Sequence, residues 1–102
     1  MLEIRPNCEC CDKDLEPNSL EAMICSYECT FCTACVNDIL NNVCPNCGGG
    51  FVARPIRPKQ ARIDGVSLEH QPASTKRINT PYSKEELITF SEKYKDILPE
   101  DR

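Results

Sequence analysis

The residues of this chain that can do chemistry are its cysteines. All nine lie between positions 8 and 47 of the 102-residue sequence, and eight of them form short-spaced pairs: Cys8-x2-Cys11, Cys25-x3-Cys29, Cys32-x2-Cys35 and Cys44-x2-Cys47. In such a knuckle the intervening residues form a tight turn, so both sulfurs reach one ion. Four thiolates complete the tetrahedral shell of a structural zinc site and leave no position for water or substrate. The sequence therefore predicts two structural zinc ions.

Metal is favoured over disulfides for three reasons. The chain opens MLEIRPNCEC, in which Glu3 and Arg5 interrupt any apolar run, so we expect no secretory signal and a cytoplasmic location. Structural disulfides do not persist in that reducing compartment. The cysteines also come as closely spaced pairs, and their number is odd. Iron–sulfur proteins use the same thiolates, but their usual spacings fit this sequence less well.

The knuckles differ in the strength of their signal. Pro45 sets the turn of the last knuckle, and the glycines after Cys47 let the backbone bend past the second sulfur. Cys10 lies inside the first knuckle and is the ninth thiol, either a spare or a replacement ligand; we expect a spare.

The elements that position these ligands are expected to be short. Strands are predicted at residues 2–5, 21–25 and 30–31, and a helix at 33–40 that ends at Asn41 and Asn42. Few bulky apolar side chains are available, so metal binding must supply stability, roughly 10–16 kcal/mol per structural zinc ion.

The C-terminal segment has its own helix signal. Ser83 and Glu86 form a capping box, and four apolar residues then recur at helical spacing before Pro99 ends the pattern. We expect an amphipathic helix at 84–98. Because a single helix of this length is marginal in water, its apolar face needs a partner. That partner is the cysteine-rich segment itself, a second copy of the chain or another protein.

Three segments follow from the composition: a zinc-binding domain at 1–52, a proline-rich linker or extended arm at 53–81, and the C-terminal helix at 82–102. Residues 1–50 contain two basic and eight acidic residues, which argues against nucleic-acid binding. No apolar stretch is long enough to cross a membrane. We expect the four bases of the arm to be solvated, namely Arg54, Arg57, Lys59 and Arg62.

The order and spacing of the four pairs is similar to the RING-finger pattern in an all-cysteine form. That resemblance implies a cross-brace, in which alternate pairs share an ion, within a small α+β, zinc-stabilised module of RING-like or treble-clef type. It implies one ligand set of Cys8, Cys11, Cys32 and Cys35, and a second set of Cys25, Cys29, Cys44 and Cys47.

The motifs MLEIRPNCECC, ICSYECTFC and CPNCGG also resemble a family of short bacterial cysteine-rich proteins of unknown function, which implies metal binding but no activity. Ligase RING domains usually carry an apolar residue after the first ligand and a basic residue after the last. Here those positions are Glu9 and Gly48, which argues against ubiquitin transfer.

No catalytic constellation accompanies the cysteines. We expect His70, the only histidine, to lie on the surface, Asp12, Asp14 and Glu16 to form a solvated acidic loop, and Tyr27 to be exposed. The leading hypothesis is a structural zinc-binding protein that serves as an interaction or scaffold module. The alternatives are a nucleic-acid-associated zinc ribbon that uses the basic residues 54–62, and a RING-type ligase-like or thiol redox protein.

Overall fold

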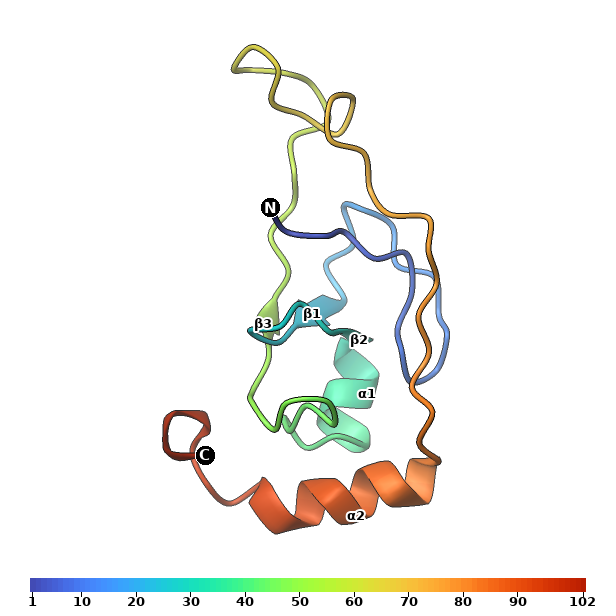
Figure 1. Cartoon of the computed structure of the whole chain (residues 1–102), viewed down its shortest axis with the longest axis vertical. Coiled ribbons are helices and arrows are strands. Elements are labelled where there is room, and N and C mark those ends of the chain that lie inside the picture. Colours follow the sequence, from blue (N-terminus) through green and yellow to red (C-terminus); the bar gives the residue numbers. More distant parts are fainter.

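The structure is a computed structural model that describes all residues from Met1 to Arg102. It is a small α+β fold, as predicted, with three short strands and two α-helices (Figure 1). In chain order the elements are β1 (Ala22–Ile24), β2 (Thr30–Cys32), α1 (Thr33–Asp38), β3 (Val52–Ala53), α2 (Lys84–Tyr94) and a 3-10 turn (Pro99–Asp101). No helix is long and apolar enough to span a bilayer.

The three strands form an antiparallel sheet in the order β2-β1-β3. Met23 of β1 lies opposite Phe31 of β2 and Ala53 of β3. The strands expected at 21–25 and 30–31 are therefore confirmed. The two-residue strand β3 was not predicted, because it is short and exposed and has no sequence signal.

The strand expected at residues 2–5 is wrong. The carbonyls of this segment are taken by another part of the chain: Ser74 N donates to Ile4 O (2.9 Å), and Arg54 Nη1 donates to Arg5 O (2.9 Å). The side chain of Arg57 donates to Leu2 O. Because side chains and a single amide satisfy these carbonyls, the segment is extended but forms no ladder.

Helix α1 begins directly after β2, and the predicted stop signal, Asn41 and Asn42, follows its last turn. Asn41 and Asn42 have left-handed backbones, with φ values of 47° and 58°, a conformation that asparagine tolerates better than most residues. The regular helix is two residues shorter than predicted. Its last turn widens, since the amides of both Ile39 and Leu40 donate to Cys35 O.

The apolar core is small and rich in sulfur. Six of the 13 residues in the core cluster are cysteines. Phe31 and Phe51 pack edge to face, with ring centroids 5.4 Å apart, and Val36 and Leu40 contribute the buried face of α1. The side chains that would bind metal thus also form much of the interior, so metal binding and packing act at the same place.

Helix α2 lies across the end of α1 (Figure 1) and has the predicted capping box, with Ser83 Oγ accepting from Glu86 N (3.1 Å). Its buried residues are Leu87 and Ser91, and Asn41 Nδ2 donates to Ser91 Oγ (3.1 Å). The helix ends four residues before the predicted boundary. Because Pro99 disfavours helical backbone in the residue before it, Leu98 is extended (φ −58°, ψ 143°).

Residues 54–81 contain no helix or strand, and Figure 1 shows their outer half as a loop projecting from one end of a molecule that measures 46 × 27 × 18 Å. The expectation that Arg54 is solvated is wrong, because its side chain is buried and donates to Arg5 O (2.9 Å) and Glu16 O (3.0 Å). Arg57 is half-buried, whereas Lys59 and Arg62 are exposed. The division of the chain at residues 52 and 81 stays a prediction.

Candidate metal centre

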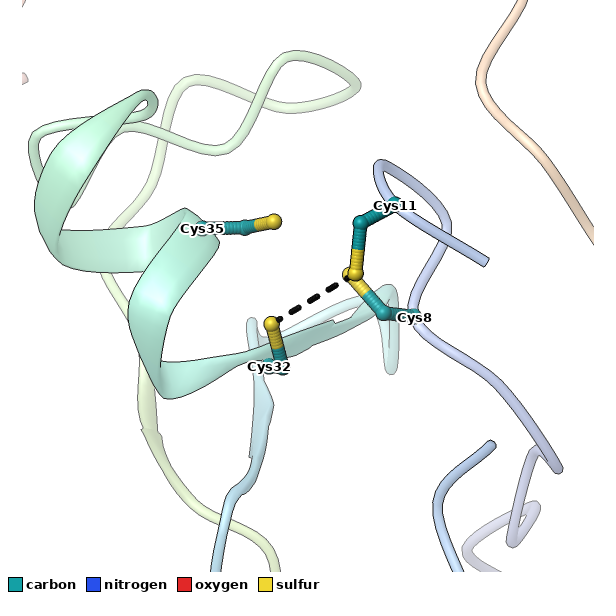
Figure 2. Close-up of side chains that lie close together, drawn as sticks. All are labelled: Cys8, Cys11, Cys32 and Cys35. Carbon is teal, nitrogen blue, oxygen red and sulfur yellow. Dashed lines mark hydrogen bonds between the residues drawn. The ribbon is translucent and has the colours of Figure 1, made fainter. Parts of the chain in front are cut away.

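The first cysteine group joins the first and third knuckles. The Sγ atoms of all four of its members lie within 4.8 Å of one another, and Cys11 Sγ is 3.8 Å from Cys32 Sγ (Figure 2). The first knuckle contributes Cys8 and Cys11, the end of β2 contributes Cys32, and the first turn of α1 contributes Cys35. This is the crossed pairing that the RING resemblance implied for the first ligand set.

The second group joins the second and fourth knuckles but contains three cysteines, Cys25, Cys44 and Cys47, with mutual Sγ distances within 4.8 Å. Cys29, the fourth predicted ligand, is buried but lies outside this group. Backbone amides point at the sulfurs, as the knuckle geometry predicts: Tyr27 N donates to Cys25 Sγ (3.3 Å) and Gly49 N to Cys47 Sγ (3.4 Å). The assignment of all eight cysteines as ligands stays a prediction.

The first and last knuckles have the same backbone hydrogen bonds. In the first, Cys8 N donates to Lys13 O and Asp12 N donates to Cys8 O, both at 2.9 Å. In the last, Cys44 N donates to Gly49 O (2.8 Å) and Gly48 N to Cys44 O (2.7 Å). The residue after the second cysteine is left-handed in both, with φ of 64° at Asp12 and 79° at Gly48. The first knuckle therefore has the same turn as the last, with aspartate in place of the glycine.

Burial of several of these thiols favours the protonated form over the thiolate. Burial raises the pKa of Cys8 to about 11 and also raises the pKa values of Cys35 and Cys44. Burial opposes ionisation of Cys11 as well, but hydrogen bonds from the Lys13 backbone and from neighbouring thiols outweigh it and lower its pKa. Zinc binds the thiolate form, so metal binding at these groups is coupled to proton release.

Cys29 borders the second group. Burial raises its pKa, and the thiol of Cys25 adds to this effect, whereas the side chain of Asn46 opposes it. The backbone of Cys29 is bound to that of Cys25, because Cys25 N donates to Cys29 O (3.2 Å), but the Cys29 sulfur does not join the compact group of three. Four sulfurs in the first group and three with a bordering fourth in the second suit zinc, which prefers sulfur and nitrogen donors in tetrahedral sites.

Cys10 belongs to neither group. Its side chain is partly buried, and burial raises its pKa, while a hydrogen bond with Cys35 lowers it. The expectation that Cys10 is a spare thiol stays a prediction.

The remaining residues singled out from the sequence lie away from the sulfurs or on the surface. His70 is exposed, and its Nδ1 lies 2.9 Å from Ser67 Oγ. Tyr27 is exposed, as expected. The acidic loop is exposed but not only solvated, because Arg77 pairs with Asp12 (2.9 Å) and Asp14 (2.6 Å).

Sequence reasoning missed the role of Glu9, which it considered only as a departure from ligase RING domains. Its side chain is 4% exposed, and its carboxylate accepts from Thr30 N and from Asn46 Nδ2. A glutamate next to a ligand gives no sequence signal of burial, because glutamate is almost always on the surface.

Burial of Arg54 has a further consequence, since it removes one of the four bases proposed to contact phosphate.

Comparison with known proteins places the chain in a family. Residues 1–57 match the family described as "Protein of unknown function (DUF1272)". An uncharacterized protein from Rhizobium meliloti (strain 1021) is 53% identical over 81 residues, which cover 79% of this chain and 89% of that protein. No solved structure matches the chain. The matched residues include both cysteine groups, and the chain belongs to the DUF1272 family.

Proposed function

We propose that this protein is a structural zinc-binding module that holds two zinc ions and acts in protein–protein contacts. One observation carries the metal part of this proposal: the cysteine sulfurs gather into two groups, and each group joins two knuckles that are not neighbours in the sequence. Convergence of this kind is needed for metal binding, whereas the hydrophobic core alone gives no reason to gather seven thiols into two clusters.

The proposed role is non-catalytic. A zinc ion bound by four thiolates has no open position for water or substrate, so it acts by holding the fold. The fourth ligand of the second ion would be Cys29, whose carbonyl accepts from Cys25 N (3.2 Å). A small movement of the Cys29 sulfur toward the other three would complete the tetrahedral shell of the second ion.

The contact surface in this proposal is formed by exposed apolar side chains at the two ends of α2. Tyr82, directly before the N-cap, is 46% exposed, and Ile97 and Leu98, which follow the helix, are 40% and 60% exposed. Two surface depressions meet at Phe90, one that includes Pro45 and Tyr82 and one that includes Tyr94 and Gly49. An exposed apolar and aromatic surface on a small protein is typical of an interaction site.

Metal quantification with thiol counting on protein purified without added metal tests the zinc proposal. We expect two zinc ions per chain and no cystine. The neighbouring cysteines Cys10 and Cys11 supply a matched pair of variants, since Cys11→Ser should lose an ion and Cys10→Ser should keep both. Cys29→Ser should also lose an ion, because its thiol completes the second shell. Wild-type protein with cystines in place of metal would contradict the proposal.

Sedimentation velocity over a range of concentrations tests the contact surface for self-association. If a second copy is the partner, Tyr94→Ser combined with Leu98→Ser should shift the chain to monomer without changing its zinc content. A wild-type monomer at all concentrations would exclude a second copy and leave a different protein as the partner.

A further inference from the structure

The carboxylate of Glu9 is buried, and both of its oxygens accept hydrogen bonds. Oε2 accepts from Thr30 N (2.8 Å) and from Arg5 Nη1 (3.0 Å), and Oε1 accepts from Asn46 Nδ2 (3.3 Å). Its backbone is also used, because Glu9 N donates to Thr30 O (3.0 Å) and Thr80 N donates to Glu9 O (2.8 Å). One residue thus contacts four separate segments of the chain.

The hydrogen bond between Glu9 and Asn46 connects the two cysteine groups. Glu9 directly follows Cys8 of the first group, and Asn46 lies between Cys44 and Cys47 of the second. Thr30 directly follows Cys29 and lies two residues before Cys32, so its amide stands where the chain passes from the second group to the first. The carboxylate therefore ties the first knuckle to the fourth and to the segment that joins the two groups.

Packing alone does not explain a carboxylate at this position. A buried charge is costly unless it is paired, and an apolar side chain of similar size would fill the same space without that cost. Arg5, whose side chain is 16% exposed, supplies the opposite charge. Three donors converge on this carboxylate, and hydrogen bonds to an ionised acceptor are shorter and about twice as strong as neutral ones.

The bond to Asn46 gives the carboxylate a direct route to the second group. Glu9 Oε1 accepts from Asn46 Nδ2 (3.3 Å), which lies in the loop between Cys44 and Cys47. Glu9 Oε2 accepts from the amide of Thr30 (2.8 Å), the residue directly after Cys29. The carboxylate therefore links the fourth knuckle to the segment that carries the predicted fourth ligand. Partners that orient ligands from outside the first shell commonly change metal affinity about 10–100-fold when they are removed.

We propose that Glu9 is a positioning residue for the second metal centre, although it adjoins a ligand of the first. This inference rests on the proposed function, because it assumes that both cysteine groups bind metal. Its carboxylate holds Asn46 and the Thr30 amide, and through them it keeps Cys29 beside the group of Cys25, Cys44 and Cys47. Without the carboxylate the second ion is bound less tightly, while the first ion keeps all its ligands.

Zinc release to an excess of chelator from the loaded full-length protein tests this inference. Glu9→Gln removes the charge and one acceptor at almost constant volume, and Glu21→Gln is the matched control, because Glu21 is exposed and pairs only with Lys13. In Glu9→Gln we expect one of the two ions to leave about 10–100-fold faster. The other ion should leave at a rate within threefold of wild type, and the control should match wild type at both.

Cadmium-113 NMR identifies the affected site. Each loaded group should give one resonance, and Cys11→Ser and Cys44→Ser assign them to the first and second group. In Glu9→Gln the resonance of the second group should shift or broaden while that of the first stays in place. Asn46→Ala should reproduce this pattern, and the double variant should release the second ion no faster than the more affected single variant. Asn46→Ala also keeps the test available if Glu9→Gln does not fold.

The outcomes separate this inference from the proposed function. Wild-type protein that binds fewer than two ions contradicts the proposed function itself. If wild type binds two ions but Glu9→Gln and Asn46→Ala release both at wild-type rates, only the inference about Glu9 is overturned. Equal acceleration at both ions would also overturn it, since that result indicates general loss of structure rather than positioning of one site.

Discussion

Replacement of Leu87 by alanine should detach helix α2 from the cysteine-rich part of the chain. Leu87 is 2% exposed and is the only residue of α2 in the apolar core cluster. The substitution removes three carbons, which at about 0.8 kcal/mol each contribute roughly 2.4 kcal/mol. Because the site lies at the edge of the core, its surroundings can partly fill the space. We therefore expect a loss of about 2–3 kcal/mol, at the low end of leucine-to-alanine substitutions.

The loss should appear as local opening rather than global unfolding. An isolated helix of 11 residues is marginal in water, so α2 depends on its docked face. Hydrogen exchange by mass spectrometry on the zinc-loaded protein measures this directly. A loss of 2–3 kcal/mol corresponds to exchange of the α2 amides about 30- to 160-fold faster. Peptides that cover β2 and α1 should change little, because their order comes from the first cysteine group.

Thr89→Ala is the control, since it introduces the same residue into the same helix at an exposed position. Its α2 amides should exchange at the wild-type rate or more slowly, because alanine has the higher helix propensity. Equal exchange of α2 in Leu87→Ala and wild type would refute the reasoning, as it would mean that the helix does not depend on this contact. Faster exchange throughout the chain would refute the claim that α2 opens as a separate unit.

Three further predictions concern the metal and the buried arginine. Chelation of zinc should abolish the cooperative unfolding transition followed by circular dichroism, because six of the 13 core residues are cysteines; a retained transition would contradict this. Zinc binding at pH 7.5 should release protons, because burial holds the pKa of Cys8 near 11. The apparent zinc affinity should therefore rise with pH. Calorimetry in buffers of different ionisation enthalpy measures the number of protons released. Arg54→Ala should lower the free energy of unfolding by about 3 kcal/mol, because two carbonyls lose their donor. The control Arg62→Ala, at an exposed position of the same arm, should change the free energy of unfolding by less than about 0.5 kcal/mol. Equal effects in denaturant titrations would contradict the burial of Arg54.

The local elements were predictable where the signal is local. The capping box at Ser83 and Glu86, the left-handed stop at Asn41 and Asn42, and the turn at Gly48 each depend on a few neighbouring residues. The crossed pairing of the first and third knuckles came from the RING resemblance, not from composition or periodicity. Spacing alone identifies the cysteines that form each knuckle, but it does not identify which two knuckles share one group.

The errors concern residues whose environment is set by distant segments. Residues 2–5 have a strand-like composition, but their carbonyls are taken by the side chains of Arg54 and Arg57 and by the amide of Ser74. The burial of Arg54 and of Glu9 is invisible in sequence, since charged side chains are nearly always exposed. Arg54 donates to the carbonyls of Arg5 and Glu16, which are far away in the chain. Glu9 pairs with nearby Arg5, a pair that by itself does not indicate burial, and its other partners, Thr30 and Asn46, are distant in the chain.

The contacts of the C-terminal segment connect the proposed interaction surface to the metal centres. Arg102 donates to Asn42 O (2.7 Å) and Gly48 O (3.2 Å), and Asn41 donates to Ser91. These partners follow α1 or the last knuckle, whose positions depend on cysteines of the first and second groups respectively. The positions of these ordered loops therefore determine which face of α2 is covered. On the proposed function, metal binding would both stabilise the cysteine-rich segment and fix which apolar side chains the C-terminal segment presents to a partner.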